Sequence, residues 1–152
     1  MKFLIYILIL STLLFGYQKG DIVDKEIQQK LSLDQNKIYI IDFFASWCPS
    51  CKKEMPYISK INSTIDQNKI NIIGVCVDED IKDGQKFQKE LREANALNFR
   101  VIDDPKGEII KKFDPVGMPA LFFIKNFKVV DSIIGAKSNI DEKILTILKG
   151  LE

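Results

Sequence analysis

The chain has 152 residues, of which 46% are hydrophobic and 28% are charged, close to the composition of an average globular domain. Its 22 basic and 21 acidic side chains leave a net charge of +1, which argues against the concentrated basic surface of a nucleic-acid-binding protein. Without its first twenty residues the chain is long enough for one hydrophobic core and too short for two. We therefore expect one globular domain at residues 21–152 and no nucleic-acid partner.

Residues 1–20 differ in kind from the rest of the chain. Met1 and Lys2 precede an apolar or weakly polar run from Phe3 to Tyr17, which is the pattern of an export signal. As a helix this run would span about 22 Å, short of the roughly 30 Å hydrocarbon core. Two outcomes fit this segment: cleavage after Gly16, or retention of the uncleaved segment as a short membrane anchor, which is slightly favoured. Either way we predict an exported protein, periplasmic or otherwise extracytoplasmic, attached to the inner membrane through this segment.

Hydrophobic periodicity beyond this leader predicts strands that alternate with helices. The first two strands are continuous runs of apolar and β-branched residues, as expected of strands buried on both faces. The last two strands are joined by a hairpin-length turn. Strands are predicted at 38–44, 71–77, 99–102, 120–124 and 129–134, and helices at 24–33, 51–66, 82–96, 106–113 and 139–148.

This alternation predicts an α/β domain with a mainly parallel sheet covered by helices on both faces. The final hairpin adds an antiparallel edge to the sheet.

The segment Trp47-Cys48-Pro49-Ser50-Cys51 stands between the first buried strand and the helix that follows it. At a helix N-terminus, unsatisfied N–H groups and the macrodipole favour an anion, which lowers the pKa of the Cys48 thiol and activates it. Cys51, one turn further along, can attack a mixed disulfide made by Cys48 and release the product. We predict a redox-active pair with Cys48 as nucleophile and Cys51 as resolving thiol.

Two other uses of a Cys-x-x-Cys pair are less favoured. Zinc needs a second pair of ligands, and this chain has no His and one further Cys. A purely structural disulfide would close a very short loop and restrain the unfolded chain little. A non-catalytic binding module that kept the fold would be expected to lack one of the two cysteines, whereas this chain has both Cys48 and Cys51. We therefore expect an enzyme without a metal or other cofactor.

Three separated motifs resemble the thioredoxin superfamily, most closely its membrane-attached TlpA/ResA-like branch. They are the segment from Ile41 to Met55 around the cysteines, the helix proline Pro56, and Gly117-Met118-Pro119. The resemblance covers about residues 25–150 and includes a helix–strand insertion at roughly 82–104. It implies a thioredoxin-like fold with a central mixed sheet, helices on both faces and this insertion.

Asp42 is the most informative residue after the cysteines. A carboxylate within a buried strand is costly, and burial would raise its pKa. The superfamily's buried aspartate matches this position, six residues before Cys48, which implies a proton acceptor for the Cys51 thiol. The alternative is that the strand exposes one face at Asp42.

The resemblance also implies roles for Pro119, Trp47 and Glu79. Met118-Pro119 matches the cis-proline loop that lies against the cysteine pair and contacts substrate, and Trp47 packs beside the motif. Glu79 matches the active-site glutamate of the ResA-like branch, although its acidic neighbours compete and a solvated loop is an equal alternative.

Cys76 is the odd thiol of the chain. Flanked by Val75 and Val77 on a buried strand, it is expected to be a small core residue. The alternative is a third redox thiol.

The function implied by the resemblance is reduction of disulfides in exported proteins, with apocytochrome c as a candidate substrate. Electrons would come from a membrane thiol reductase of the CcdA or DsbD type. Pro49-Ser50 places no charged group between the cysteines, which favours the reducing direction. An oxidase or isomerase of the same fold is the alternative, and a thiol peroxidase is less favoured because the usual activating Thr and Arg are not seen near the cysteines.

Overall fold

The computed structural model describes residues 15–152. Five strands form one sheet in the order β3-β2-β1-β4-β5. Neighbours β1, β2 and β3 are parallel, whereas β4 runs antiparallel to β1 and to β5. The strands are β1 Ile38–Phe44, β2 Ile70–Cys76, β3 Arg100–Asp103, β4 Ala120–Lys125 and β5 Lys128–Ile134. The helices are α1 Lys25–Leu31, α2 Pro49–Asn62, α3 Ile81–Glu93, α4 Ile110–Phe113 and α5 Ile140–Leu151.

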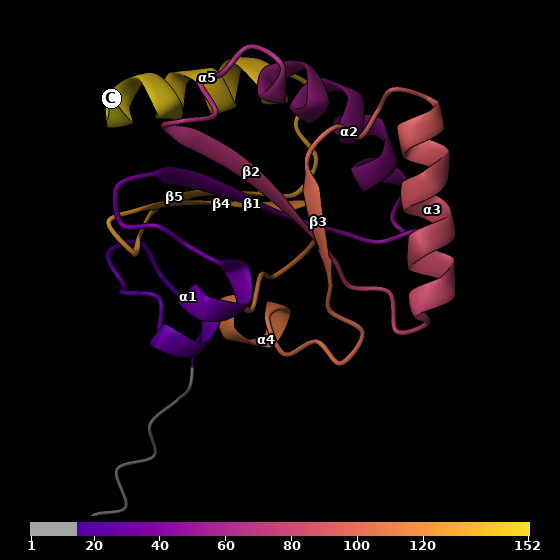
Figure 1. Ribbon diagram of the computed structural model, residues 1–152, viewed down its shortest axis with the longest axis horizontal. Helices are drawn as coiled ribbons and strands as arrows, with labels where there is room; N and C mark the ends of the chain where they lie inside the picture. Colours follow the sequence, from indigo (N-terminus) through magenta and orange to yellow (C-terminus); the bar gives the residue numbers. More distant parts are fainter. Residues whose placement is uncertain (1–14) are drawn as a thin grey trace, which may run out of the picture.

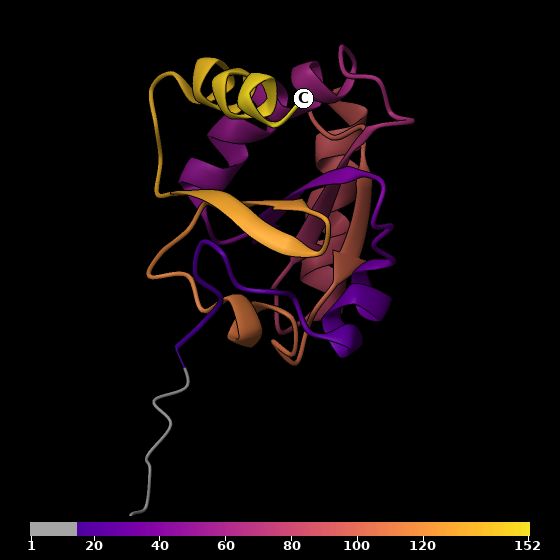
Figure 2. The same cartoon turned by 90° about the vertical axis from the view of Figure 1, so that its left-hand side faces the viewer.

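Helices cover both faces of this sheet. Figure 1 shows α2 and α5 on one side of the strands and α1 and α4 on the other, and Figure 2 shows the same layers from the side of the hairpin formed by β4 and β5. The helix α3 and the edge strand β3 form the predicted insertion beyond β2. The predicted mixed α/β sheet with helices on both faces is confirmed.

The alternation of side chains along β1 divides the hydrophobic core into two clusters. All seven residues of β1 are buried. Ile40 and Phe44 belong to the cluster under α2, α3 and α5, whereas Ile41 and Phe43 belong to the cluster over α1 and α4. Since successive strand residues point to opposite faces, Asp42 shares the face of Ile40 and Phe44 and lies toward α2. The alternative of an exposed face at Asp42 is therefore wrong.

One predicted helix is shorter in the structure. The helix expected over residues 106–113 is the single turn α4, Ile110–Phe113. Gly107 has a left-handed backbone with φ of 65°, which no regular right-handed helix can include. Asp104 then accepts hydrogen bonds from the backbone N–H groups of Ile109 and Ile110 at 3.0 and 2.9 Å, so the chain before α4 is a fixed turn.

Most of the predicted leader, residues 1–14, lies outside the described residues. The few residues that follow contact the domain: Tyr17 stacks edge-on against Phe113 with ring centroids 5.0 Å apart and donates a hydrogen bond to Asp24. Burial, with the nearby Asp24 carboxylate, raises the pKa of Tyr17 to about 12. Among residues 15–152, no helix combines the length and the apolar character that a bilayer crossing requires.

Candidate active site

The cysteine pair occupies the junction between β1 and α2. Cys48 and Cys51 form a disulfide with their Cα atoms 5.3 Å apart. Cys48 is the N-cap of α2 and its sulfur accepts the backbone N–H of Cys51 at 3.2 Å, while Pro49 occupies the first turn, where a missing N–H costs nothing. Cys48 is 6% exposed and Cys51 is 2% exposed. The predicted disulfide is confirmed, and Cys48 is the more accessible thiol.

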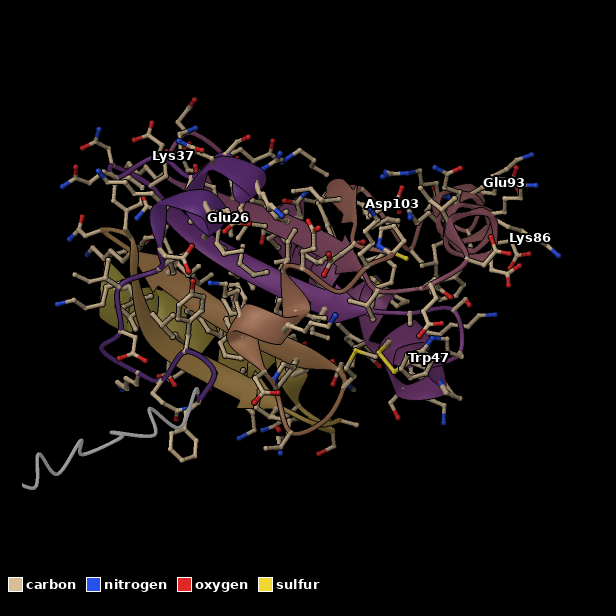
Figure 3. The ribbon with its side chains drawn as sticks, turned by 90° about the horizontal axis from the view of Figure 1, so that it is seen from below. Glu26, Lys37, Trp47, Lys86, Glu93 and Asp103 are labelled. Carbon is tan, nitrogen blue, oxygen red and sulfur yellow. A yellow bond between two sulfur atoms is a disulfide. The ribbon has the colours of Figure 1, made fainter. Side chains whose placement is uncertain are left out.

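A groove runs beside Cys48. It is an open cavity of about 720 Å³ whose wall includes Cys48, Trp47 and Met118. The Met118–Pro119 peptide is cis, as predicted for this loop. Trp47 is 65% exposed and lies beside the disulfide, as Figure 3 shows. A segment bound in this groove would meet Cys48, the apolar indole of Trp47 and the loop that carries Met118.

Asp42 lies in the middle of β1, between Gly74 of β2 and Leu121 of β4. It is 1% exposed, and its Oδ2 atom has no hydrogen-bond partner among the described residues. Burial, followed by the charge of Glu54, raises the pKa of Asp42 from 3.8 to about 8. The predicted burial is confirmed. A carboxyl group that exchanges its proton near neutral pH is suited to general acid–base chemistry.

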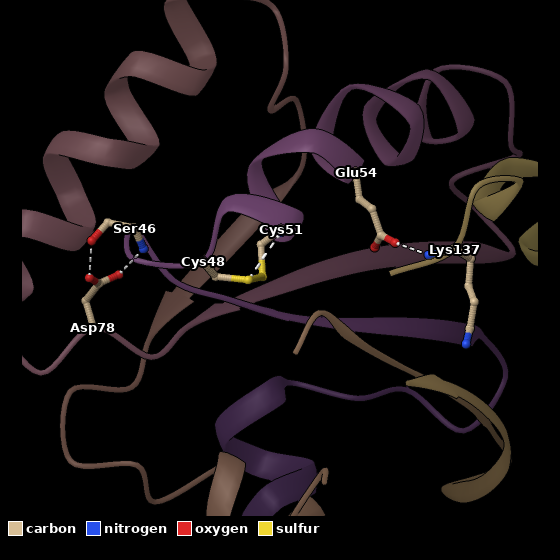
Figure 4. The surroundings of a disulfide bond; sticks show 6 residues. All are labelled: Ser46, Cys48, Cys51, Glu54, Asp78 and Lys137. Carbon is tan, nitrogen blue, oxygen red and sulfur yellow. Dashed lines mark hydrogen bonds between the residues drawn. A yellow bond between two sulfur atoms is a disulfide. The ribbon is translucent and has the colours of Figure 1, made fainter. Parts of the chain in front are cut away.

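Glu54 is a second buried carboxyl group that the sequence analysis missed. It lies on α2, one turn after Cys51, and its Oε1 atom accepts the backbone N–H of Lys137 at 3.2 Å (Figure 4). Burial raises its pKa. The sequence pattern could have revealed this burial. Cys51, Met55 and Ile58 form the apolar stripe of α2 at helical spacing, and Glu54 falls within that stripe.

The loop that presents Cys48 is held by Asp78, which the sequence indicated only as an alternative to Glu79. Asp78 is 5% exposed and follows β2. It accepts the backbone N–H of Ser46 at 2.9 Å and the Ser46 hydroxyl, two residues before Cys48 (Figure 4). Since Ser46 and Asp78 are 32 residues apart in the chain, no local pattern reveals this contact. Asp78 therefore fixes the start of the active-site loop to the end of β2.

Cys76 is the third donor to the same carboxylate. Its thiol is 1% exposed and donates a weak hydrogen bond to Oδ2 of Asp78 at 3.2 Å. Burial raises its pKa to about 12, so the thiol keeps its proton. A Cβ atom at Gly84 would lie only 2.8 Å from this sulfur, so α3 packs directly on it. The predicted burial of Cys76 in the core is confirmed, and the thiol is free in the structure.

Glu79 lies one residue beyond Asp78 but in a different setting. It is exposed and lines the groove beside Cys48. Its active-site role stays a prediction, and its position in the groove wall is compatible with that role. Of the acidic residues that competed with it, Asp78 is the buried one, and Asp80 caps α3 by accepting the backbone N–H of Lys82.

No group of His, Cys, Asp or Glu side chains within residues 15–152 is arranged to hold a metal ion. The site consists instead of the Cys48–Cys51 disulfide, an open groove that Cys48 lines, and two buried carboxyl groups, Asp42 in β1 and Glu54 in α2. This arrangement is suited to the exchange of one disulfide for another.

Comparison with known proteins agrees with this chemistry. Residues 17–133 match the model of the AhpC/TSA family. The thiol-disulfide oxidoreductase ResA of Bacillus thuringiensis subsp. konkukian is 31% identical over 105 residues, 68% of this chain and 58% of its own length. The sporulation thiol-disulfide oxidoreductase A of Bacillus subtilis is 28% identical over 85 residues, 56% of this chain and 51% of its own. The chain thus spans little more than half the length of these relatives.

Solved structures show the same fold. A protein assigned as the thiol:disulfide interchange protein DsbE of Chlorobium tepidum superimposes with a TM-score of 0.76 at 25% identity, covering 90% of this chain and 100% of the other. StoA of Bacillus subtilis superimposes with a TM-score of 0.61 at 24% identity, covering 74% of this chain and 84% of its own. The predicted thioredoxin-like fold is confirmed.

Proposed function

Because the chain belongs to the AhpC/TSA family and carries its disulfide at the start of α2 beside a cis-proline loop, we propose that it is a thiol–disulfide oxidoreductase. Its proposed direction is the reduction of disulfides in exported proteins. The observation that carries the proposal is the Cys48–Cys51 disulfide itself, whose Cys48 lines the groove. The ResA and DsbE names of the similar proteins support the same class of reaction.

The reaction starts from the reduced dithiol. The Cys48 thiolate attacks one sulfur of a substrate disulfide, so that a mixed disulfide forms and one substrate thiolate leaves. The Cys51 thiol then gives its proton to a base and attacks the Cys48 sulfur. This step releases the second substrate thiolate and forms the Cys48–Cys51 disulfide seen in the structure. Two electrons pass to the substrate, and its two thiolates each take a proton.

Asp42 is the proposed base for the Cys51 thiol. It lies on the face of β1 that α2 covers, its pKa of about 8 is in the working range, and one of its oxygens is free to accept a proton. Glu54, on the same helix as Cys51, is positioned to share this role. Trp47 and Met118 line the groove in which the substrate disulfide would be held, and Pro119, joined to Met118 by a cis peptide, sets the course of this loop.

Return to the dithiol needs two electrons from outside the protein. A membrane thiol reductase of the CcdA or DsbD type is the proposed donor, and the N-terminal apolar run from Phe3 to Tyr17 is the proposed means of export and attachment. Apocytochrome c is a candidate substrate within the same proposal.

The test of direction is the reduction potential of the Cys48–Cys51 couple, measured by equilibration with glutathione redox buffers. A potential near or below that of the glutathione pool supports a reductase. A potential far above it would instead identify a disulfide oxidase of the same fold. Measured turnover of hydrogen peroxide, with no exchange of protein disulfides, would favour the peroxidase alternative.

A further inference from the structure

The residues that line the groove beside Cys48 come from two groups of chain segments that differ in charge, and each group is called a wall of the groove below. One wall comes from the start of α2 and the chain after β2, and its one charged residue is Glu79. The other wall comes from the chain before α4, α4 itself and the cis-proline loop, and its charged residues are Lys106 and Lys111. The remaining lining residues are apolar or uncharged.

The wall that carries Lys106 and Lys111, called the lysine wall, is held in place by hydrogen bonds to the backbone. Asp104, which is buried, accepts the N–H groups of Ile109 and Ile110 at the start of α4. The Lys111 ammonium donates to the backbone carbonyl of Lys106 at 3.1 Å and so lies back over the turn. The two positive charges are therefore carried on a turn of defined shape.

Neither charge is neutralised by an ion pair within residues 15–152, where neither ammonium lies within 4.0 Å of a carboxylate. The acidic residue between them, Glu108, forms its ion pair with Lys30; this pair is the main cause that lowers the pKa of Glu108, and the more distant charges of Lys106 and Lys111 add to it. Lys106 and Lys111 are exposed and available to a ligand in the groove.

We propose that the groove selects disulfide-bearing segments with an acidic side chain beside the reactive cysteine, which Lys106 and Lys111 bind while Glu79 disfavours further acids on the opposite wall. This inference rests on the proposed function and adds a substrate class to it. Trp47 supplies an apolar contact that accepts many neighbours, so charge is the main source of selectivity in the groove.

Three peptides test the proposal. They share one sequence with an internal disulfide and differ only in the residue flanking the first cysteine, which is Glu, Gln or Lys. The protein is reduced with dithiothreitol, desalted and mixed with each peptide at low ionic strength, and the peptide dithiol is quantified after an acid quench. Each rate is divided by the rate with dithiothreitol alone, which removes the effect of the flanking charge on the peptide's own sulfur chemistry.

The Glu peptide should react about three- to tenfold faster than the Lys peptide, as expected of two exposed charge contacts. The preference should shrink in high salt because such contacts are screened. Lys106→Glu/Lys111→Glu should reverse it, and Glu79→Gln should increase it. The matched control, Lys143→Glu/Lys149→Glu on α5, changes net charge equally on the opposite layer and should leave the preference intact.

Equal rates for the three peptides, or a faster Lys peptide, would overturn the proposed selectivity while leaving disulfide exchange in place. Failure of the wild-type protein to reduce any of the three would instead count against the proposed function. An acidic preference that persists unchanged in Lys106→Glu/Lys111→Glu would place the source of selectivity outside this wall.

Discussion

Asp42, in β1, and Asp78, which follows β2, are both buried carboxyl groups, and they differ in what surrounds the carboxyl oxygens. Asp42, on the face of β1 that α2 covers, has an oxygen without a partner among the described residues and a pKa raised to about 8. Near Cys76, both oxygens of Asp78 accept hydrogen bonds. The difference shows how partners divide the roles: a carboxyl group short of donors exchanges protons, and a saturated one holds backbone in place.

The thiols follow the same division. Cys51 lies one helical turn from Cys48 and bonds to it, whereas Cys76 has no sulfur partner and donates its S–H to Asp78. Burial alone does not separate them, since Cys51 is 2% and Cys76 is 1% exposed. What separates them is the partner of Cys51: Cys48, at the start of α2, bonds to Cys51 and lines the groove.

Replacing the active-site thiols should have the largest effect. Cys48→Ser should reduce disulfide exchange to the uncatalysed rate, because it removes the nucleophile. Cys51→Ser should trap mixed disulfides between Cys48 and substrate, because the resolving thiol is gone. Non-reducing gels and mass spectrometry of the trapped species check both. Faster alkylation of Cys51 than of Cys48 in the reduced protein would show that the roles are reversed.

Asp42→Asn should slow resolution of the mixed disulfide about 100-fold at neutral pH, the usual scale for loss of a general base. In the wild type, resolution should accelerate as the pH rises toward about 8, where Asp42 ionises. The variant should lack this inflection. Stopped-flow measurement of product release from a preformed mixed disulfide checks the prediction, and unchanged resolution kinetics would remove Asp42 from the mechanism.

The same substitution should change stability in a pH-dependent way. The folded-state pKa of Asp42 is raised from 3.8 to about 8, so its protonated form favours folding below about pH 4 and this contribution is lost as the pH rises through 8. The loss amounts to about 1.4 kcal/mol per pH unit across that window. Asn cannot ionise, so Asp42→Asn should gain stability over the wild type between pH 4 and 8. Urea titrations at several pH values measure this gap, and a gap independent of pH would contradict the prediction.

Asp78→Ala should destabilise the fold by about 1–3 kcal/mol, because the donors on Ser46 and Cys76 lose a buried acceptor. Exchange should also slow, because the loop before Cys48 is no longer fixed. Ser46→Ala is the matched control: it removes the hydroxyl donor but keeps the backbone N–H bond, so its effects should be smaller. Urea unfolding and disulfide-exchange rates of the two variants test this prediction. Equal effects of Asp78→Ala and Ser46→Ala would argue against Asp78 as the residue that fixes the loop before Cys48.

Cys76 should give the smallest effect. Cys76→Ala should cost about 1 kcal/mol through a small cavity and the lost S–H donor, without changing turnover. Cys76→Ser keeps a donor to Asp78 and serves as the paired variant. Mass spectrometry of the oxidised wild type adds a direct check. A substantial disulfide between Cys76 and either active-site cysteine would make Cys76 a third redox thiol, and its distinction from Cys51 would no longer hold.

Sequence patterns predicted much of this protein because they act over short distances. The strand β1 was predicted with the bounds that the structure has, since its seven residues form one apolar run interrupted only by Asp42. The disulfide followed from the two-residue spacing at a strand-to-helix junction, and the cis peptide before Pro119 followed from its resemblance to a known loop. Even the burial of Asp42 was predictable from its strand neighbours.

Contacts between distant segments were decided only by the tertiary structure. The missing partner of Asp42 depends on what β4 and α2 bring near it, and the bonds from Ser46 to Asp78 join residues 32 positions apart. The lysine wall arises because the turn after Asp104 delays the start of the predicted helix to Ile110, and Lys106 and Lys111 then lie along the groove. Local propensity determines which segments become strands and helices, but the set of donors and charges around a side chain is fixed only when those segments pack.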